Sequence, residues 1–267
     1  MKKIIHRIIL LFGILAVCIG GYQYYLIEKE DQAGIDVYEE IEETIIVDQT
    51  KDAQDNIAKQ LQPNIPPEID FAALKAINED VVGWLYSANT PINYPILQGE
   101  SNETYLRTMI DGRANRSGSI FMDYRNEADY SDYKTLLYCH NMDNGKMFGS
   151  LKKYKQQDYY NNHKNMWLLT EEKTYRLNVL SSYKTEADSE DYRLLTSKEA
   201  LETYKADIIK RSVIGTEVNI DTVEKVVVLS TCSYETEDAR IVVICDIEEI
   251  AEAEMEQLRK EAETLIP

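Results

Sequence analysis

The chain has 267 residues, with 47 acidic and 29 basic side chains and a formal net charge of −18. An apolar fraction of 44%, with 11 glycines and 6 prolines, excludes a collagen-like, low-complexity or wholly disordered chain. Phosphate contacts need a basic face, and no stripe of lysine and arginine supplies one, so the sequence also disfavours a nucleic-acid binder. The length suffices for one well-buried domain plus an appendage.

The N-terminus carries a candidate membrane helix. Residues 8–27 contain no charged side chain, and a helix of that length, at about 1.5 Å per residue, spans a hydrocarbon core. Lys2, Lys3 and Arg7 precede this run, and acidic residues follow it from Glu28 onward. We therefore expect residues 1–27 to form a single-pass membrane anchor, with the N-terminus in the cytoplasm and the remainder outside the cell.

Two other interpretations of this segment stay open. A cleaved signal peptide needs small residues at its cut site, whereas the run here continues through Gln23-Tyr24-Tyr25. The segment Leu15-Ala16-Val17-Cys18 is weakly similar to a lipoprotein cleavage box, in which Cys18 would carry the lipid.

Residues 28–69 are predicted to form a helical stem or linker. Their apolar side chains recur at steps of three and four among carboxylates, which is typical of an amphipathic helix, at Ile35, Tyr38, Ile41, Ile45 and Ile46. Pro66-Pro67 ends the segment, because proline lacks the amide donor and moves the preceding residue out of the helical region. We place a domain over 70–247 and an acidic C-terminal helix over 248–267.

Within 70–247, short runs of β-branched and aromatic residues alternate with turn-forming residues such as Asn89-Thr90-Pro91. A short helix is expected around 71–78, and a longer one over 197–213 with Ser197 as its N-cap. Eight strands are predicted, over 81–86, 92–97, 119–123, 135–139, 166–169, 174–179, 223–229 and 240–246. Eight strands with few intervening helices predict a mainly β fold, namely a closed eight-stranded barrel with peripheral helices.

Cysteine and histidine provide the candidate chemistry. Cys18 lies in the apolar run, so three of the four cysteines remain for the domain, an odd number that implies no disulfide framework. Cys232 and His140 each end an apolar run, and a strand end can hold a side chain rigidly beside a cleft. A thiol becomes a nucleophile when a base lowers its pKa, although Cys232 could also be packed and inert. Cys245, inside a strand run, is interpreted as a small core hydrophobe.

Arg240 opens the apolar run that follows Cys232. If these two runs form adjacent antiparallel strands, Cys232 and Arg240 lie side by side at one rim of the barrel. The alternative is a surface salt bridge from Arg240 to Asp238 or Glu237. The three histidines are not spaced with another ligand, so we expect neither a metal site nor a cofactor.

Leu229-Ser230-Thr231-Cys232, followed by Arg240-Ile241-Val242-Val243, resembles the active-site signature of sortases. The similarity covers about residues 70–247 and includes the helix before the cysteine strand. Four further blocks resemble class B sortases in order and spacing: Gly83-Trp84 with 92–96, then 102–106, then 118–123, and finally 140–142 with Met147-Phe148.

This resemblance implies a membrane-anchored cysteine transpeptidase on the outer face of a Gram-positive cell. Cys232 would attack the threonine carbonyl of a C-terminal sorting signal and form a thioester, which an amine then resolves. His140 would pair with the thiolate and protonate the leaving amine, and Arg240 would stabilise the oxyanion. The implied partners are surface proteins or pilins that bear the sorting signal, and a peptidoglycan precursor or a pilin lysine as the acceptor.

The resemblance also assigns a peptide-binding groove, residue by residue, to Asn102, Leu106, Tyr138, Ser230 and Thr231.

Two positions depart from the family pattern. Cys139 stands where a glycine usually precedes the histidine, and strand alternation from His140 would point its side chain away from the cleft. Ser233 follows the nucleophile where some relatives have a carboxylate. Two other functions remain open: a thiol peptidase of the same scaffold that acts mainly as a hydrolase, and a non-catalytic surface adhesion or scaffold module.

Overall fold

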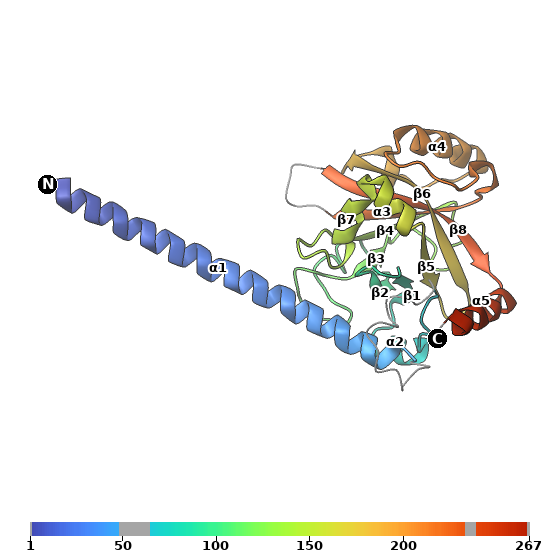
Figure 1. Ribbon diagram of the computed structural model, residues 1–267, viewed down its shortest axis with the longest axis horizontal. Helices are drawn as coiled ribbons and strands as arrows, with labels where there is room; N and C mark the ends of the chain where they lie inside the picture. Colours follow the sequence, from blue (N-terminus) through green and yellow to red (C-terminus); the bar gives the residue numbers. More distant parts are fainter. Residues whose placement is uncertain (1, 48–64, 233–238, 266–267) are drawn as a thin grey trace.

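One long helix connects the N-terminus to a domain built around a β-barrel (Figure 1). The computed structural model describes residues 2–47, 65–232 and 239–265. The helix, α1 (Lys2–Ile45), is continuous, so the predicted membrane segment and the first part of the predicted stem, up to Ile45, form a single helix. Residues 48–64 of the predicted stem lie outside the described residues. The first half of α1 extends away from the domain, and its second half lies along it (Figure 1).

The barrel of the described residues closes in the order β1-β2-β3-β4-β7-β8-β6-β5, which confirms the predicted eight-stranded barrel. Two neighbouring pairs are parallel, β2 with β3 and β4 with β7, and the other pairs are antiparallel. The strands are β1 (Val81–Tyr86), β2 (Asn93–Leu97), β3 (Ile120–Met122), β4 (Lys134–His140), β5 (Asn165–Leu169), β6 (Thr174–Glu186), β7 (Val226–Cys232) and β8 (Ala239–Ile250).

Several strands differ from their predicted bounds: β7 begins and ends three residues later than predicted, β4 is one residue longer at each end, and β6 and β8 extend furthest. β6 was expected to end at Val179, but it continues to Glu186 through a register shift between Val179 and Ser181. Polar residues interrupt the sequence pattern there, yet Ser181 is fully buried and its hydroxyl donates to the Ile208 carbonyl at 2.8 Å. β8 likewise extends to Ile250, because its last residues pair with the start of β6.

Helices cover the outside of the barrel (Figure 1). The predicted internal helix is confirmed as α4 (Lys198–Arg211), and the Ser197 hydroxyl accepts from the Ala200 amide at 3.2 Å, as an N-cap does. Because β8 is longer than predicted, the C-terminal helix, α5, begins four residues later than expected (Glu252–Leu265). The remaining helices are α2 (Phe71–Ile77), η2 (Phe148–Lys155), α3 (Gln157–Asn162), η3 (Glu190–Tyr192) and η4 (Ile220–Thr222).

The core lies inside the barrel and beneath η2. β4 is buried along its whole length, and so are the described side chains of β7 from Val226 to Thr231. Continuous burial is expected of strands that pack on both faces, which explains why both read as unbroken apolar runs. These two strands therefore have little freedom to shift along one another.

The second half of α1 packs against the barrel, which confirms the amphipathic pattern of the stem. Val37, Tyr38, Ile41 and Ile45 are buried at spacings of one to four residues, so they form one stripe on the helix. The end of the helix is fixed further, because the Ile45 carbonyl accepts from the Asp70 amide at 3.0 Å.

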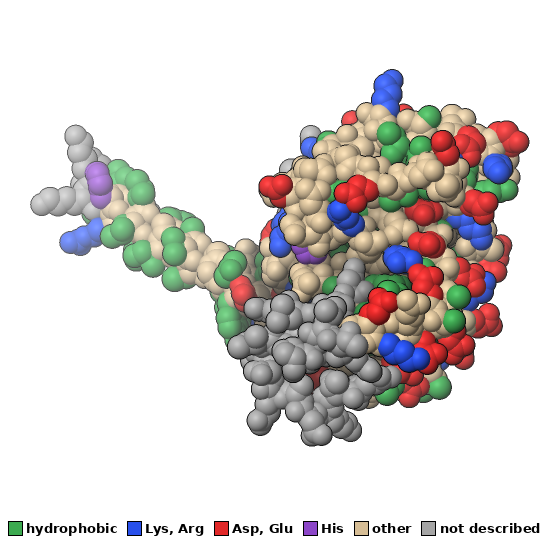
Figure 2. Space-filling view, turned by 45° about the vertical axis from the view of Figure 1, so that its right-hand side comes forward, with side chains coloured by type: hydrophobic (Ala, Val, Ile, Leu, Met, Phe, Trp, Pro, Cys, Tyr) green, Lys and Arg blue, Asp and Glu red, His purple; other side chains and the backbone are tan. Residues whose placement is uncertain are grey.

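The first half of α1 carries the membrane-anchor candidate. Among the described residues this is the one helix long and apolar enough to cross a membrane, with a mean hydropathy of 2.3 in a window that is not buried. Figure 2 shows apolar side chains along this arm, while acidic and basic side chains are spread over the visible face of the domain. The N-terminal helix thus fits the predicted anchor.

Candidate functional site

His140 and Cys232 end two neighbouring strands at the same level. β4 and β7 are parallel, so their carboxyl ends meet at one rim, and the register pairs His140 with Cys232. The side chain of Cys232 lies outside the described residues, as do Ser233, Glu237 and Asp238. The backbone register alone brings the predicted histidine and the predicted nucleophile together.

Arg240 lies on the other side of β7. β7 and β8 are adjacent and antiparallel, which is the arrangement that would bring Cys232 and Arg240 side by side, and Ser230 lies opposite Val242. Continuing this register by two residues places Cys232 opposite Arg240. The Arg240 guanidinium donates to the Thr231 carbonyl at 3.3 Å, so its head lies against the end of β7. His140, Cys232 and Arg240 therefore occupy one row across β4, β7 and β8.

The His140 ring is held by a backbone carbonyl. Its Nε2 lies 2.6 Å from the Leu106 oxygen and, because a carbonyl oxygen only accepts, Nε2 bears a proton in this arrangement. Burial lowers the pKa of His140, the Leu106 carbonyl partly opposes that shift, and the charges of Arg107 and Arg116 lower it further. The imidazolium form is therefore a stronger acid than that of an ordinary histidine.

Two of the predicted groove residues meet at Asp123. Asn102 Nδ2 and the Tyr138 hydroxyl both donate to Asp123 Oδ2 at 3.0 Å. Burial raises the pKa of Asp123, but hydrogen bonds from Arg125 and Asn102 outweigh it, so the pKa is lowered overall. Arg125 binds both carboxylate oxygens, at 2.7 and 2.8 Å, which keeps Asp123 charged and fixed in position.

Tyr192, which sequence reasoning missed, connects this cluster to the row of His140, Cys232 and Arg240. Its hydroxyl lies 2.9 Å from Ser230 Oγ, and its ring centre lies 5.9 Å from the Arg240 guanidinium carbon. Its ring also lies 6.0 Å from that of Tyr138. Tyr192 sits in a polar segment without strand or helix periodicity, so no sequence pattern marked it.

Leu106 and Thr231 contribute differently from the other predicted groove residues. Leu106 is half-buried and reaches His140 through its backbone carbonyl. The Thr231 side chain is buried, and its hydroxyl accepts from the Ile241 amide at 3.0 Å within the barrel wall. Its carbonyl, rather than its side chain, meets Arg240.

Cys139 is fully buried and acts electrostatically on the hydroxyls of Tyr38 and Tyr94, where it adds to the rise in pKa that burial causes. Over residues 2–47, 65–232 and 239–265, no group of three or more His, Cys, Asp or Glu side chains is arranged to hold a metal ion.

Comparison with known proteins identifies the family and the fold. The sortase domain family matches residues 87–248. Sortase B of Staphylococcus aureus is 31% identical over 255 residues, which cover 92% of this chain and 98% of that protein. The structure of a Staphylococcus aureus sortase B–substrate complex matches with a TM-score of 0.70 and 30% identity, over 84% of this chain and all of the other (100%).

A Streptococcus pyogenes class B sortase involved in pilus biogenesis has a similar structure, with a TM-score of 0.61 and 35% identity, over 67% of this chain and 98% of its own. The chain therefore belongs to the sortase family, and within it to class B. Sortases are cysteine transpeptidases, so the chain is an enzyme of this type. The family is membrane-associated, in agreement with the apolar first half of α1.

Proposed function

We propose that this sortase cleaves a C-terminal sorting signal after threonine, through a thioester on Cys232, and transfers the protein to an amine. The observation that carries the proposal is the row of His140, Cys232 and Arg240 across β4, β7 and β8. Residues opposed across neighbouring strands share a face of the sheet, so this row is a favourable place for a nucleophile, an acid and a fixed cation.

In the first half-reaction the Cys232 thiolate attacks the threonine carbonyl carbon. Arg240 stabilises the resulting oxyanion, since a fixed cation beside developing negative charge needs no reorganisation during the reaction. Collapse of the intermediate breaks the carbon–nitrogen bond and leaves the acyl group on sulfur. The His140 imidazolium gives its proton to the departing amine, a role to which its lowered pKa is suited.

In the second half-reaction an amine attacks the thioester and loses its proton to His140. The new amide bond forms, and the Cys232 thiolate leaves. The acceptor amine is a peptidoglycan precursor or a pilin lysine. The similarity to a class B sortase involved in pilus biogenesis supports considering the pilin as well as the cell wall.

The peptide is proposed to bind along β4 and β7, next to the residues that precede His140 and Cys232 in these strands. Tyr138 and Ser230 are paired two residues before His140 and Cys232, and strand alternation places such residues on one face. Asn102 joins Tyr138 through Asp123. Leu106 and the Thr231 peptide group would complete the groove next to the histidine and the arginine.

The membrane orientation is proposed from the charges that flank the apolar run. Lys2, Lys3 and Arg7 precede the run and acidic residues follow it, so the N-terminus lies in the cytoplasm and the barrel outside the cell. Surface proteins or pilins that carry the sorting signal would meet the enzyme there.

The test uses the full chain in detergent micelles and a library of labelled pentapeptides that contain threonine, with and without hydroxylamine. We expect cleavage under both conditions, and a threonine hydroxamate when hydroxylamine is present, because it traps a thioester. Free acid as the sole product under both conditions would defeat the transfer reaction. Mass spectrometry of the transfer product from cells then identifies donor and acceptor together.

A further inference from the structure

His140 is held by two segments, and α1 touches both. One is the 105–119 hairpin, residues 105–119 between β2 and β3, whose Leu106 carbonyl meets the His140 ring. The other is the 141–147 turn, residues 141–147, which directly follows His140 and is closed by the antiparallel bridge between Asn141 and Met147. A helix that contacts both segments is placed to influence the ring between them.

The 105–119 hairpin is a tightly bonded unit. Its two arms pair between Thr108 and Ala114, and the Ser119 amide donates to the Tyr105 carbonyl at 3.1 Å. Gly118 has φ +55°, and a Cβ added there would overlap the Leu106 carbonyl oxygen. The arm of the hairpin that carries Gly118 therefore packs directly against the Leu106 carbonyl oxygen, which binds His140. A shift of this arm would move that oxygen.

The stem half of α1 holds that same arm. The Tyr38 hydroxyl donates to the Gly118 carbonyl at 2.7 Å and lies 2.8 Å from Ser119 Oγ. One turn earlier, Gly34 packs so closely that an added Cβ would lie 2.7 Å from Ser117 Oγ. Glu30 also accepts from the Arg116 amide at 2.9 Å. The helix thus contacts four successive residues of the arm, 116–119.

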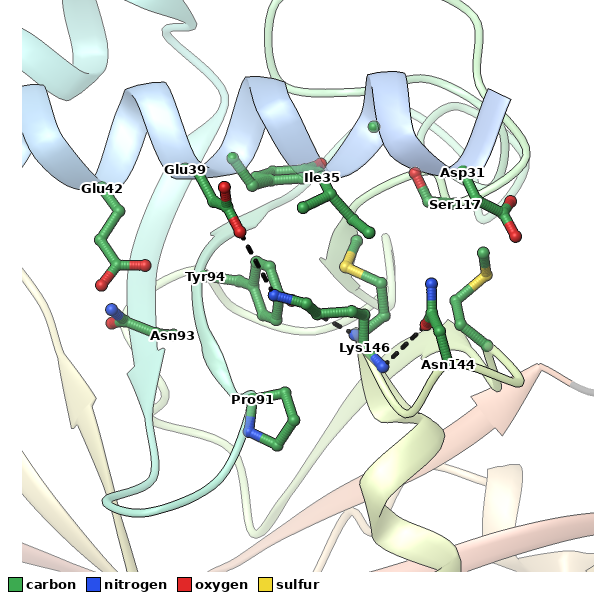
Figure 3. A pocket seen from close by; sticks show the side chains of 14 residues that line it. Asp31, Ile35, Glu39, Glu42, Pro91, Asn93, Tyr94, Ser117, Asn144 and Lys146 are labelled. Atoms are coloured by element: carbon green, nitrogen blue, oxygen red, sulfur yellow. Dashed lines mark hydrogen bonds and ion pairs between the residues drawn. The ribbon is translucent and has the colours of Figure 1, made fainter. Parts of the chain in front are cut away.

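The helix also reaches the 141–147 turn (Figure 3). Glu39 pairs with Lys146 at 3.5 Å, across a cavity of about 130 Å³ between α1 and the turn. The Tyr38 ring packs edge-on against Tyr94 at 5.3 Å, and the Tyr94 hydroxyl accepts from the Met147 amide at 3.4 Å. Tyr38 therefore contacts the hairpin directly and the turn through Tyr94.

We propose that the stem half of α1 positions His140, with Tyr38 as the central positioning residue, so that the membrane-anchored helix is part of the support of the active site. The physical reason is that His140 Nε2 is bonded to the Leu106 oxygen, so a shift of that oxygen shifts the ring. The effect on turnover rests on the proposed role of His140, whereas the effect on the ring itself does not.

The direct test measures the His140 ring. The full chain, with His6→Gln and His163→Gln, is labelled with ¹⁵N-histidine in detergent micelles, so that His140 gives the one histidine signal. Its Nε2 proton should exchange slowly with water because it is buried and bonded to Leu106. In Tyr38→Phe we expect exchange to accelerate roughly fivefold, the effect of losing one ordinary hydrogen bond.

Tyr154→Phe is the matched control. Its hydroxyl also donates to a backbone carbonyl, that of residue 163, at 2.8 Å, and Tyr154 is likewise buried. Its hydroxyl and its ring contact residues 163 and 159, which belong to neither segment around His140. Exchange in this variant should match the parent chain. Unchanged exchange in Tyr38→Phe, or equal acceleration in both variants, overturns the proposal.

A second pair of variants, Gly34→Ala and its control Gly20→Ala, tests the proposal if Tyr38→Phe fails to fold. Gly34→Ala should separate the helix from the hairpin and accelerate exchange, whereas Gly20→Ala adds the same methyl where nothing lies within 4 Å. Equal exchange in these two variants also overturns the proposal.

Turnover of the library peptides tests the effect on catalysis. Tyr38→Phe should lower kcat several-fold and change KM less, because Leu106 is the one proposed groove residue in the hairpin that Tyr38 holds. If His140→Ala retains full activity, the proposed function fails, yet the exchange result still decides whether the stem positions the ring.

Discussion

His140 and Cys232 are paired in register at the ends of the parallel strands β4 and β7. A parallel pair brings the carboxyl ends of both strands to one rim, and burial of β4 and β7 keeps the two strands from slipping. The relative positions of the proposed acid, His140, and the proposed nucleophile, Cys232, along their strands are therefore fixed by two buried strands rather than by a loop.

The first prediction concerns the nucleophile. Cys232→Ala should abolish cleavage and transfer while leaving the melting temperature nearly unchanged, because the residue ends its strand and the change removes one sulfur. Activity is measured with the peptide library and stability by thermal unfolding. Cys245→Ala is the control: Cys245 is fully buried, so we expect lower stability with cleavage retained. Full cleavage by Cys232→Ala would remove Cys232 from its proposed role.

The second prediction concerns the cation. Arg240→Lys keeps the charge but loses the planar fork that reaches the Thr231 carbonyl and lies near the Tyr192 ring. We expect kcat/KM to fall roughly tenfold or more, with little change in melting temperature. Equal activity in the two proteins would favour an ordinary surface arginine.

The sequence allowed much of this site to be predicted, for identifiable reasons. Apolar runs that stop at His140 and at Cys232 mark strand ends directly, and a short connection favours antiparallel pairing of the strands that carry Cys232 and Arg240. The parallel pairing of β4 with β7 is different. It joins segments far apart in the chain, so the strand pattern did not indicate it, and the resemblance to sortases implied only that His140 lies next to the Cys232 thiolate.

Other features could not be predicted because they depend on tertiary packing. Tyr192 occupies a short 3₁₀ turn in a polar segment, where only the folded chain brings it to Ser230 and Arg240. The extension of β6 was missed because Ser181 and Ser182 interrupt the apolar pattern, although both are fully buried. A buried serine that bonds to a carbonyl looks the same in a sequence as an exposed one.

The third prediction concerns pH. In the proposed mechanism His140 must be protonated in the free enzyme, so its deprotonation sets the basic limb of kcat/KM. Burial lowers the pKa of His140, so this limb should lie below the ordinary histidine value of about 6.5. Arg107→Gln removes a charge that lowers this pKa, so the limb should move to higher pH. Arg113→Gln, in the same hairpin but paired with Asp111, should leave it in place.

The same shift affects stability, and its sign follows from proton binding. Between the lowered pKa of folded His140 and the ordinary value of the unfolded chain, the unfolded state binds more protons. Stability from this residue is thus complete above about pH 6.5 and is lost as the pH falls below it. A basic limb above the ordinary histidine value, or no response to Arg107→Gln, would contradict this account.

The fourth prediction concerns the support of Tyr192. Its neighbour Asp191 is fully buried and accepts hydrogen bonds from Arg211 at 2.7 and 2.9 Å, which ties η3 to α4. Burial raises the pKa of Asp191, but the bonds from Arg211, Tyr183 and neighbouring hydroxyls outweigh it and hold the pKa well below its usual range. Asp191→Asn leaves the guanidinium without its buried carboxylate, so we expect a loss of about 3 kcal/mol in the free energy of unfolding at pH 7.

The pH dependence of that loss separates the ion pair from a general packing defect. A carboxyl with a lowered folded pKa contributes stability above its unfolded value of about 3.9 and loses it as the pH falls. The difference between parent and Asp191→Asn in urea unfolding should therefore shrink from pH 7 to pH 3. Asp207→Asn removes the exposed carboxylate partner of the same Arg211 and should cost less than about 1 kcal/mol. Equal losses in the two variants, or a difference that does not change with pH, would show that Asp191 does not act through its charge.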